Sequence, residues 1–192
     1  MKKTGNPRIL FVEDEGVIAP FYIQELKLAG YDVEFYQGVD SIYTALASEQ
    51  RPHVDLFITD VMMPPEKSLA NEPTSEGLLS GLFLAQKVRN TFPDVPVILL
   101  SGLTFESVRE SASQFAMRLE NCILLEKRQT RPRDLVNIVD RYFRELVLES
   151  GQKISVFSRL FKSLLLQPNF YGVGIDLKKL GKDTDTEAKS GH

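Results

Sequence analysis

The stretch that decides the fold is Leu56-Phe57-Ile58-Thr59-Asp60-Val61-Met62-Met63-Pro64-Pro65. It opens with a short apolar run, which is typical of a parallel strand buried on both faces. The two prolines cannot continue a strand ladder, so the strand must end near Asp60. In an open parallel sheet, ligands bind at the carboxyl ends of the strands. The sequence therefore predicts that Asp60 lies where chemistry takes place.

The composition is that of a soluble globular chain, with 192 residues, 43% of them hydrophobic and 26% charged. Its net charge of −3 gives no general reason to expect direct nucleic-acid binding. The single cysteine, Cys122, excludes an internal disulfide framework and is expected in the core. The start Met1-Lys2-Lys3 is followed by no hydrophobic stretch, and no run approaches the ~20 apolar residues of a membrane span. We therefore expect a cytoplasmic protein without a membrane span.

Strand and helix patterns alternate five times along the chain between Ile9 and Leu148. The predicted strands are Ile9–Val12, Tyr31–Tyr36, Leu56–Asp60, Val97–Leu100 and Cys122–Leu125, and helical patterns follow each of them. The Tyr31–Tyr36 run alternates more than the others, which suits an edge strand. This alternation predicts an α/β fold, a doubly wound parallel sheet with helices on both faces.

Polar groups stand where the predicted strands end. Glu13 and Asp14 follow the first strand, Asp60 ends the third, Ser101 follows the fourth and Lys127 follows the fifth. In a parallel sheet these groups converge at one edge. Three carboxylates within ~5 Å repel by about 1–3 kcal/mol per pair at effective dielectric constants of about 80 to 20, and one lysine cannot offset all of that.

A divalent cation would offset this repulsion. Ligation by oxygen atoms, mostly carboxylate, favours Mg²⁺, and no histidine or thiolate is placed to suggest zinc. Phosphoryl transfer onto Asp60 fits such a site, because a carboxylate can act as a nucleophile. The metal and Lys127 would stabilise charge on the phosphoryl oxygens, and the Ser101 hydroxyl would hydrogen-bond one of them. Gly102 has no side chain and leaves room beside the phosphate.

The segments Val12-Glu13-Asp14-Glu15, Thr59–Pro64, Leu100-Ser101-Gly102 and Glu126-Lys127 together resemble the receiver domain of two-component response regulators. The resemblance covers residues 7–149, with the elements in the order of the family. It implies a flavodoxin-like fold, with five parallel strands in the order 2-1-3-4-5.

The resemblance also implies the role of each site residue. Asp60 would be the phosphoacceptor, Lys127 would pair with the phosphate and Ser101 would be the switch hydroxyl. The implied ligands of Mg²⁺ are Asp14, Asp60 and the main-chain oxygen of Met62, with Glu13 acting mostly through water. The implied phosphodonor is a histidine kinase or a phosphotransfer protein.

Three features depart from the family pattern. Leu124 stands where the family usually has an aromatic residue. This puts in question the coupling between movement of the switch hydroxyl toward the phosphate and rotation of an aromatic ring. Arg128 stands where the family usually has proline after the lysine. The loop over residues 65–80 is much longer than usual. Two hypotheses fit it, a tolerated surface insertion and a lid or partner contact.

Residues 150–181 are expected to form a helical and extended appendage, and the polar residues 182–192 a disordered tail. An apolar face runs through the appendage at Ile154, Phe157, Leu160, Phe161, Leu164 and Leu165. Three readings stay open: a segment packed back on the receiver, a homodimer or partner-docking element, and a membrane-surface helix. The appendage is too short for an ordinary DNA-binding output domain.

The leading functional hypothesis is a signalling receiver that is phosphorylated on Asp60 and acts through contacts with an unknown downstream protein. It would be no enzyme beyond its own phosphorylation and dephosphorylation. A phosphatase of the haloacid-dehalogenase type needs a second aspartate at the position of Met62, which cannot transfer protons. The alternative is a degenerate receiver used as a scaffold or dimerisation module. The full set of acids plus lysine argues against it, whereas Leu124 and Arg128 leave it open.

Overall fold

The structure is a computed structural model that describes residues 5–48, 52–102, 106–119 and 121–148. Its strands are β1 (Arg8–Val12), β2 (Asp32–Tyr36), β3 (Leu56–Asp60), β4 (Val97–Ser101) and β5 (Cys122–Glu126). Its helices are α1 (Ala19–Leu28), α2 (Val39–Ala47), α3 (Ser80–Thr91), α4 (Glu106–Arg118) and α5 (Pro132–Leu148).

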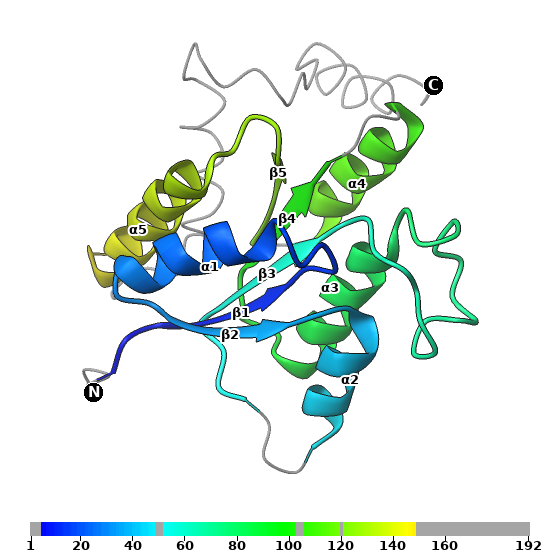
Figure 1. The fold of residues 1–192 in the computed structure, drawn as a ribbon, viewed down its shortest axis with the longest axis horizontal. Coiled ribbons are helices and arrows are strands. Elements are labelled where there is room, and N and C mark those ends of the chain that lie inside the picture. Colours follow the sequence, from blue (N-terminus) through cyan, green and yellow to red (C-terminus); the bar gives the residue numbers. More distant parts are fainter. Residues whose placement is uncertain (1–4, 49–51, 103–105, 120, 149–192) are drawn as a thin grey trace, which may run out of the picture.

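The strands form one five-stranded sheet in the order β2-β1-β3-β4-β5, and every neighbouring pair is parallel. Figure 1 shows α1 and α5 on one side of this sheet and α2, α3 and α4 on the other. The prediction of a doubly wound sheet with this strand order is confirmed. So is the edge position of β2, in which Val33 is buried and the other side chains are exposed or partly buried.

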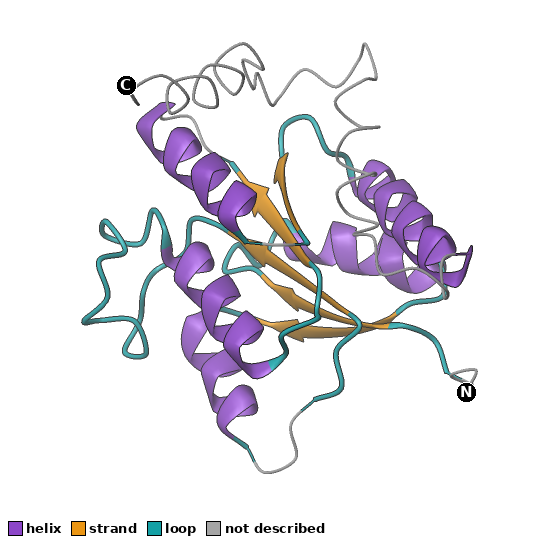
Figure 2. Ribbon diagram, turned by 180° about the vertical axis from the view of Figure 1, so that it is seen from behind, coloured by secondary structure: helices purple, strands orange, loops and turns teal. Residues whose placement is uncertain are grey.

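Each face of the sheet has its own hydrophobic core, and Figure 2 shows from behind the helices that cover the two faces. Ile9 and Phe11 of β1 pack under α1 and α5, whereas their neighbours Leu10 and Val12 pack under α2 and α3. All residues of β3 and β4 are buried, because helices cover both faces there. This arrangement explains why both segments read as uninterrupted apolar runs.

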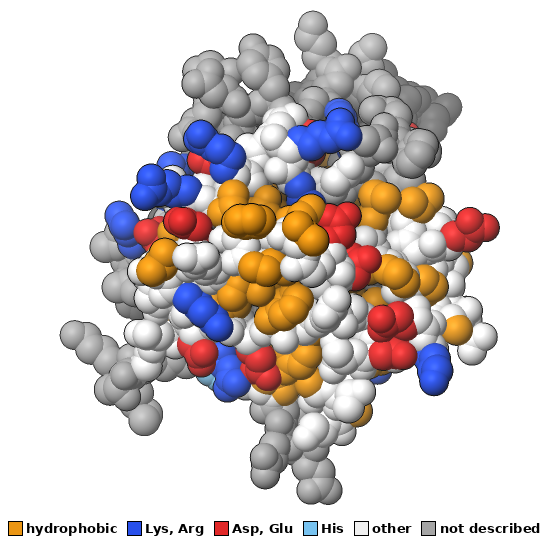
Figure 3. Space-filling view, in the orientation of Figure 1, with side chains coloured by type: hydrophobic (Ala, Val, Ile, Leu, Met, Phe, Trp, Pro, Cys, Tyr) orange, Lys and Arg blue, Asp and Glu red, His pale blue; other side chains and the backbone are white. Residues whose placement is uncertain are grey.

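Hydrophobic side chains are exposed on the outer side of α1. Val17 just before the helix, Phe21 and Leu28 are 80%, 61% and 73% exposed, and Phe35 of β2 is 37% exposed. Figure 3 shows hydrophobic side chains gathered across the middle of the face on which α1 and β2 lie. Exposed apolar groups that gather on one face are typical of an interaction surface.

The predicted appendage at 150–181, its tail at 182–192 and the homodimer contact expected there lie outside the described residues. In the part of the chain that the structure does describe, every helix is too short or too polar to cross a membrane.

Candidate functional site

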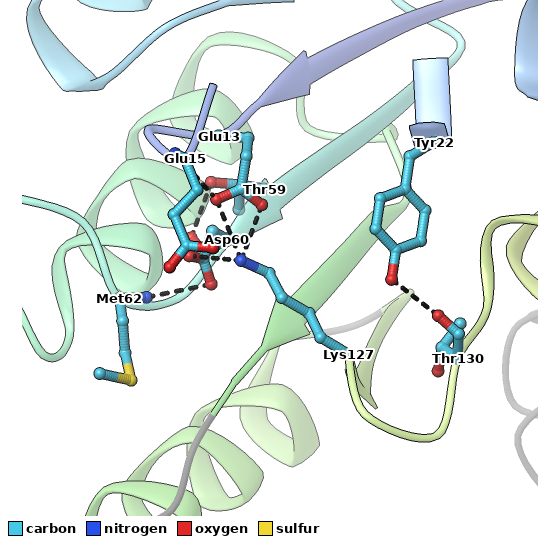
Figure 4. A network of polar contacts seen from close by, with 8 residues as sticks. All are labelled: Glu13, Glu15, Tyr22, Thr59, Asp60, Met62, Lys127 and Thr130. Atoms are coloured by element: carbon cyan, nitrogen blue, oxygen red, sulfur yellow. Dashed lines mark hydrogen bonds and ion pairs between the residues drawn. The ribbon is translucent and has the colours of Figure 1, made fainter. Parts of the chain in front are cut away.

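The strand register brings the predicted site residues to one edge of the sheet. Val12 pairs with Thr59, and Asp60 pairs with Leu100, so Glu13 and Asp60 emerge at the same level. Ser101 pairs with Glu126, which places Lys127 one residue further along the same edge. Figure 4 shows Glu13, Asp60 and Lys127 pointing toward one another from three strand ends.

Lys127 bridges two buried carboxylates. Its Nζ lies 2.8 Å from Asp60 Oδ2 and 2.7 Å from Glu13 Oε2. The three side chains are almost removed from solvent, with exposed fractions of 11% for Lys127, 0% for Glu13 and 3% for Asp60. In such a setting charges are screened little, so each one depends strongly on its neighbours.

Burial sets the protonation of this cluster. It raises the pKa of Glu13 to about 7, and the neighbouring charge of Asp60 adds to that rise, against the opposing effect of Lys127. Burial also raises the pKa of Asp14 and of Asp60. For Lys127 burial acts downward, but the Asp60 and Glu13 carboxylates outweigh it and the pKa is raised. The lysine therefore stays charged, whereas the charged forms of the carboxylates are disfavoured.

The carboxylates of Glu13, Asp14 and Asp60 fit a divalent cation. One oxygen from each can be chosen so that all lie within 4.8 Å of one another. Asp14 Oδ1 is buried and has no hydrogen-bond partner among the described residues. A buried carboxylate oxygen in that state is costly unless something positive binds it. These oxygen donors suit Mg²⁺, and the single positive charge of Lys127 does not neutralise all three carboxylates.

Two further predicted residues lie at this edge. The Met62 main-chain N–H donates to Asp60 Oδ1 at 3.3 Å, so the residue after next holds the aspartate in place. Ser101 is 1% exposed and directly follows Leu100, the register partner of Asp60. Its carbonyl accepts the Lys127 main-chain N–H at 2.8 Å, which links β4 to the start of the β5–α5 loop.

The position of the expected aromatic residue is filled by an aliphatic side chain in the core. Leu124 is 7% exposed, pairs with Leu99 of β4 and packs with the residues under α3 and α4. Arg128, in the place of the expected proline, is exposed. Both departures from the family pattern thus border the site without adding a charge to its buried cluster.

The long β3–α3 loop is a loop, as predicted, but it is anchored. Glu66 accepts a hydrogen bond from the main-chain N–H of Asp40 at the start of α2. In return, the Asp40 carboxylate accepts from the main-chain N–H groups of Ser68 at 2.8 Å and Lys67 at 3.4 Å. Leu69 in the same loop is 2% exposed and packs in the core under α2 and α3.

Directly after this loop, the first turn of α3 packs against the backbone of Asp60 and Val61. Gly81 N–H donates to the Val61 carbonyl at 3.0 Å. A Cβ on Gly81 would lie 1.8 Å from the Asp60 carbonyl oxygen, which no real side chain tolerates. Gly77 has φ of +96° and its N-terminal neighbours Ser75 and Glu76 have φ of 52° and 58°, a left-handed run that turns the chain back. The sequence pattern did not reveal this contact with Asp60.

A second unpredicted contact lies on the other side of the site. The Tyr22 hydroxyl of α1 donates to the Thr130 carbonyl of the β5–α5 loop at 2.7 Å (Figure 4). The two residues are 108 positions apart. No local motif marks such a pair in the sequence.

No family model matches the chain. The response regulator receiver protein CpdR of Brucella abortus (strain 2308) is 28% identical over 134 residues, which are 70% of this chain and 94% of that protein. The DNA-binding dual master transcriptional regulator RpaA of Synechocystis sp. (strain ATCC 27184 / PCC 6803 / Kazusa) is 33% identical over 100 residues. That match covers 50% of this chain but only 34% of RpaA.

A solved structure shows the same fold. The response regulator receiver domain protein (CheY-like) from Methanospirillum hungatei JF-1 superposes with a TM-score of 0.57 and 21% identity, covering 76% of this chain and 100% of that one. The strand order, the acidic cluster with its lysine and the match to CpdR over nearly its whole length agree. The chain therefore has the fold of response regulator receiver domains and is similar in sequence to the response regulator receiver protein CpdR.

Proposed function

We propose that Asp60 accepts a phosphoryl group from a histidine kinase or a phosphotransfer protein, and that this modification controls contacts with a downstream protein. The observation that carries the proposal is the buried contact of 2.8 Å between Lys127 Nζ and Asp60 Oδ2, beside the carboxylates of Glu13 and Asp14. A structural ion pair needs one carboxylate, whereas three at the carboxyl edge of a parallel sheet favour a reactive site.

The residues divide the work of the transfer. An Asp60 carboxylate oxygen attacks the phosphorus of a phosphohistidine, the P–N bond breaks and its electron pair returns to the imidazole. Lys127 balances the negative charge that the phosphoryl oxygens bring to the edge of the sheet, because it stays protonated there. The Met62 N–H fixes the direction of the Asp60 carboxylate, and Ser101 offers a hydroxyl to the phosphoryl group.

Asp14, Asp60 and the main-chain oxygen of Met62 would hold Mg²⁺, with Glu13 acting mostly through water. When bound, the cation neutralises charge on the carboxylates and the phosphoryl oxygens. The buried Asp14 Oδ1, which has no described hydrogen-bond partner, supports this assignment.

The exposed apolar side chains of α1 offer a docking face for the phosphodonor. α1 begins a few residues after Glu13 and Asp14, so a protein bound on Val17 and Phe21 lies close to Asp60. We expect Phe21→Ser to slow transfer from a donor protein and to leave phosphorylation by acetyl phosphate unchanged. Equal slowing with both donors would place the effect in the site and not in docking.

The test of the proposed function is the intact mass after incubation with Mg²⁺ and acetyl phosphate, with Asp60→Asn alongside. Addition of one phosphoryl group to the wild type and none to the variant is the expected result. Omission of Mg²⁺ should abolish the addition. A folded protein that takes up no phosphoryl group from acetyl phosphate or from any histidine kinase offered would contradict the proposal and favour a scaffold.

A further inference from the structure

The loop that carries Lys127 is short and is tied at both ends. At its start the Lys127 N–H donates to the Ser101 carbonyl at 2.8 Å. At its far end, Gln129 and Thr130 both donate their main-chain N–H groups to the Glu126 carbonyl, at 3.0 and 2.9 Å. The loop thus forms a single turn, with Lys127 at its start and Thr130 at its end.

The remaining anchor of this turn comes from α1. The Tyr22 hydroxyl donates to the Thr130 carbonyl at 2.7 Å, and the two residues are only 4% and 2% exposed. The Tyr22 ring is itself fixed, because it stacks on Phe11 of β1 with 6.1 Å between ring centroids. A buried carbonyl with a fixed donor holds its loop far more firmly than one that faces water.

We propose that Tyr22 is a positioning residue for phosphoryl transfer, which holds the β5–α5 turn so that Lys127 Nζ stays between Glu13 and Asp60. The proposal rests on the proposed function and deepens it. Arg128 stands where the family usually has proline, so this turn lacks the ring that would restrict its backbone. The hydrogen bond from Tyr22 supplies the restriction from outside the loop.

The protonation of Tyr22 supports this role. Burial raises the pKa of its hydroxyl, and the nearby Lys127 opposes that rise without cancelling it. The hydroxyl therefore remains a donor throughout the neutral range.

The test compares Tyr22→Phe with a matched control, Tyr31→Phe. Tyr31, which follows α1, also donates its hydroxyl to α5, to Asp140 at 2.5 Å, but among the described residues it makes no hydrogen bond with the Lys127 loop. Each variant keeps the ring and loses one hydroxyl that donates a hydrogen bond, buried at Tyr22 and partly buried at Tyr31. The first measurement is the rate of phosphoryl uptake from acetyl phosphate with saturating Mg²⁺. We expect Tyr22→Phe to be slower by about three- to tenfold, the range for one buried hydrogen bond, and Tyr31→Phe to match the wild type.

A second measurement separates this inference from the proposed function. The ammonium signal of Lys127 in ¹⁵N–¹H spectra reports how firmly Nζ is held, with no phosphoryl group present. We expect the signal to broaden in Tyr22→Phe and to persist in Tyr31→Phe. If the wild type takes up no phosphoryl group, the proposed function fails while this signal still decides the role of Tyr22. Uptake rates and signals that are alike in both variants would overturn the inference.

Discussion

Two loops leave the same edge of the sheet beside Asp60, and they are held in opposite ways. The β5–α5 loop, residues 127–131, is a single turn that carries Lys127 and is fixed by groups from outside it, Ser101 and Tyr22. The β3–α3 loop, residues 61–79, is long and is fixed by its own side chains, Glu66 and Leu69. The β5–α5 loop, which carries Lys127, is thus held by residues of β4 and α1. The β3–α3 loop is held to α2 by its own side chains.

This difference shows where variation is tolerated. The insertion can keep its shape as long as its hydrogen bonds with Asp40 and its buried leucine persist, because those contacts join it to α2 and to the core. Directly after the insertion, however, Gly81 in the first turn of α3 meets the backbone of Asp60. Changes within the insertion and changes at the start of α3 should therefore have different consequences.

The largest effect is expected from Gly81→Ala. The new Cβ would lie 1.8 Å from the Asp60 carbonyl oxygen and 2.7 Å from Val61 Cα, and both are backbone atoms that cannot move alone. We expect a loss of about 4 kcal/mol in the free energy of unfolding, measured with urea, because overpacking shifts α3 against β3. Gly102→Ala is the control, since a Cβ there meets nothing within 4 Å. Equal stability of the two variants would refute the contact.

Leu69→Ala should be next in size. Leu69 is 2% exposed in the core under α2 and α3, and its truncation should lower the free energy of unfolding by about 3 kcal/mol. If the insertion serves only to hold itself in place, phosphoryl uptake by this variant remains at the wild-type rate. A slower uptake would instead support the reading of residues 65–80 as a lid over the site.

The acidic cluster should make stability fall with rising pH when Mg²⁺ is removed by a chelator. The pKa of Glu13 is about 7 in the folded chain against 4.5 in the unfolded one, so the folded state binds the extra proton between these values. Stability is therefore full below pH 4.5 and declines as the pH rises through 7, by about 3 kcal/mol. Thermal or urea unfolding of Glu13→Gln across this range should show no such decline. A slope unchanged by the substitution would assign it to another group.

The smallest effect is expected at the tie between the insertion and α2. Glu66→Gln keeps the size of the side chain but removes the charge that faces the start of α2, so we expect a loss of about 1 kcal/mol or less. Proteolysis within residues 64–79 should become faster, because the loop loses one of its anchors. Unchanged cleavage would show that Leu69 alone keeps the loop in place.

The stability that the Asp40 carboxylate contributes to the contact between the insertion and α2 should depend on pH in the opposite direction from that of Glu13. Hydrogen bonds from Ser68, and then from Lys67, hold the pKa of Asp40 below its ordinary value of 3.8. Its contribution is therefore present above pH 3.8 and is lost as the pH falls through the lowered folded value. Amide exchange of Lys67 and Ser68 followed down to acid pH checks this, and Asp40→Asn should remove the dependence.

Most of the fold and the centre of the site could be predicted from the sequence for one physical reason. Parallel strands send their carboxyl ends to the same edge, so acids after β1 and β3 and a lysine after β5 must converge. Glu13, Asp60 and Lys127 could be assigned on that basis, and the structure brings them together. Their roles in phosphoryl transfer, and that of Ser101, remain predictions.

The contacts that hold the loops could not be predicted in the same way. Tyr22 reads as a core residue of an amphipathic helix, and nothing in its neighbourhood marks a partner 108 positions away. No sequence pattern pairs Asp40 with residues 66–68. Their hydrogen bonds form only because the insertion turns back toward α2. Such contacts depend on tertiary geometry, which periodicity does not encode.

The lone cysteine in β5 makes the chain a ready background for site-directed labelling. Cys122 is the single cysteine of the sequence, and burial raises the pKa of its thiol to about 12. Little thiolate is therefore present at neutral pH, and maleimide reagents should react with Cys122 only slowly. A fluorophore on a cysteine introduced at exposed Arg128 or Asn71 would report on one loop at a time, without first removing a native thiol.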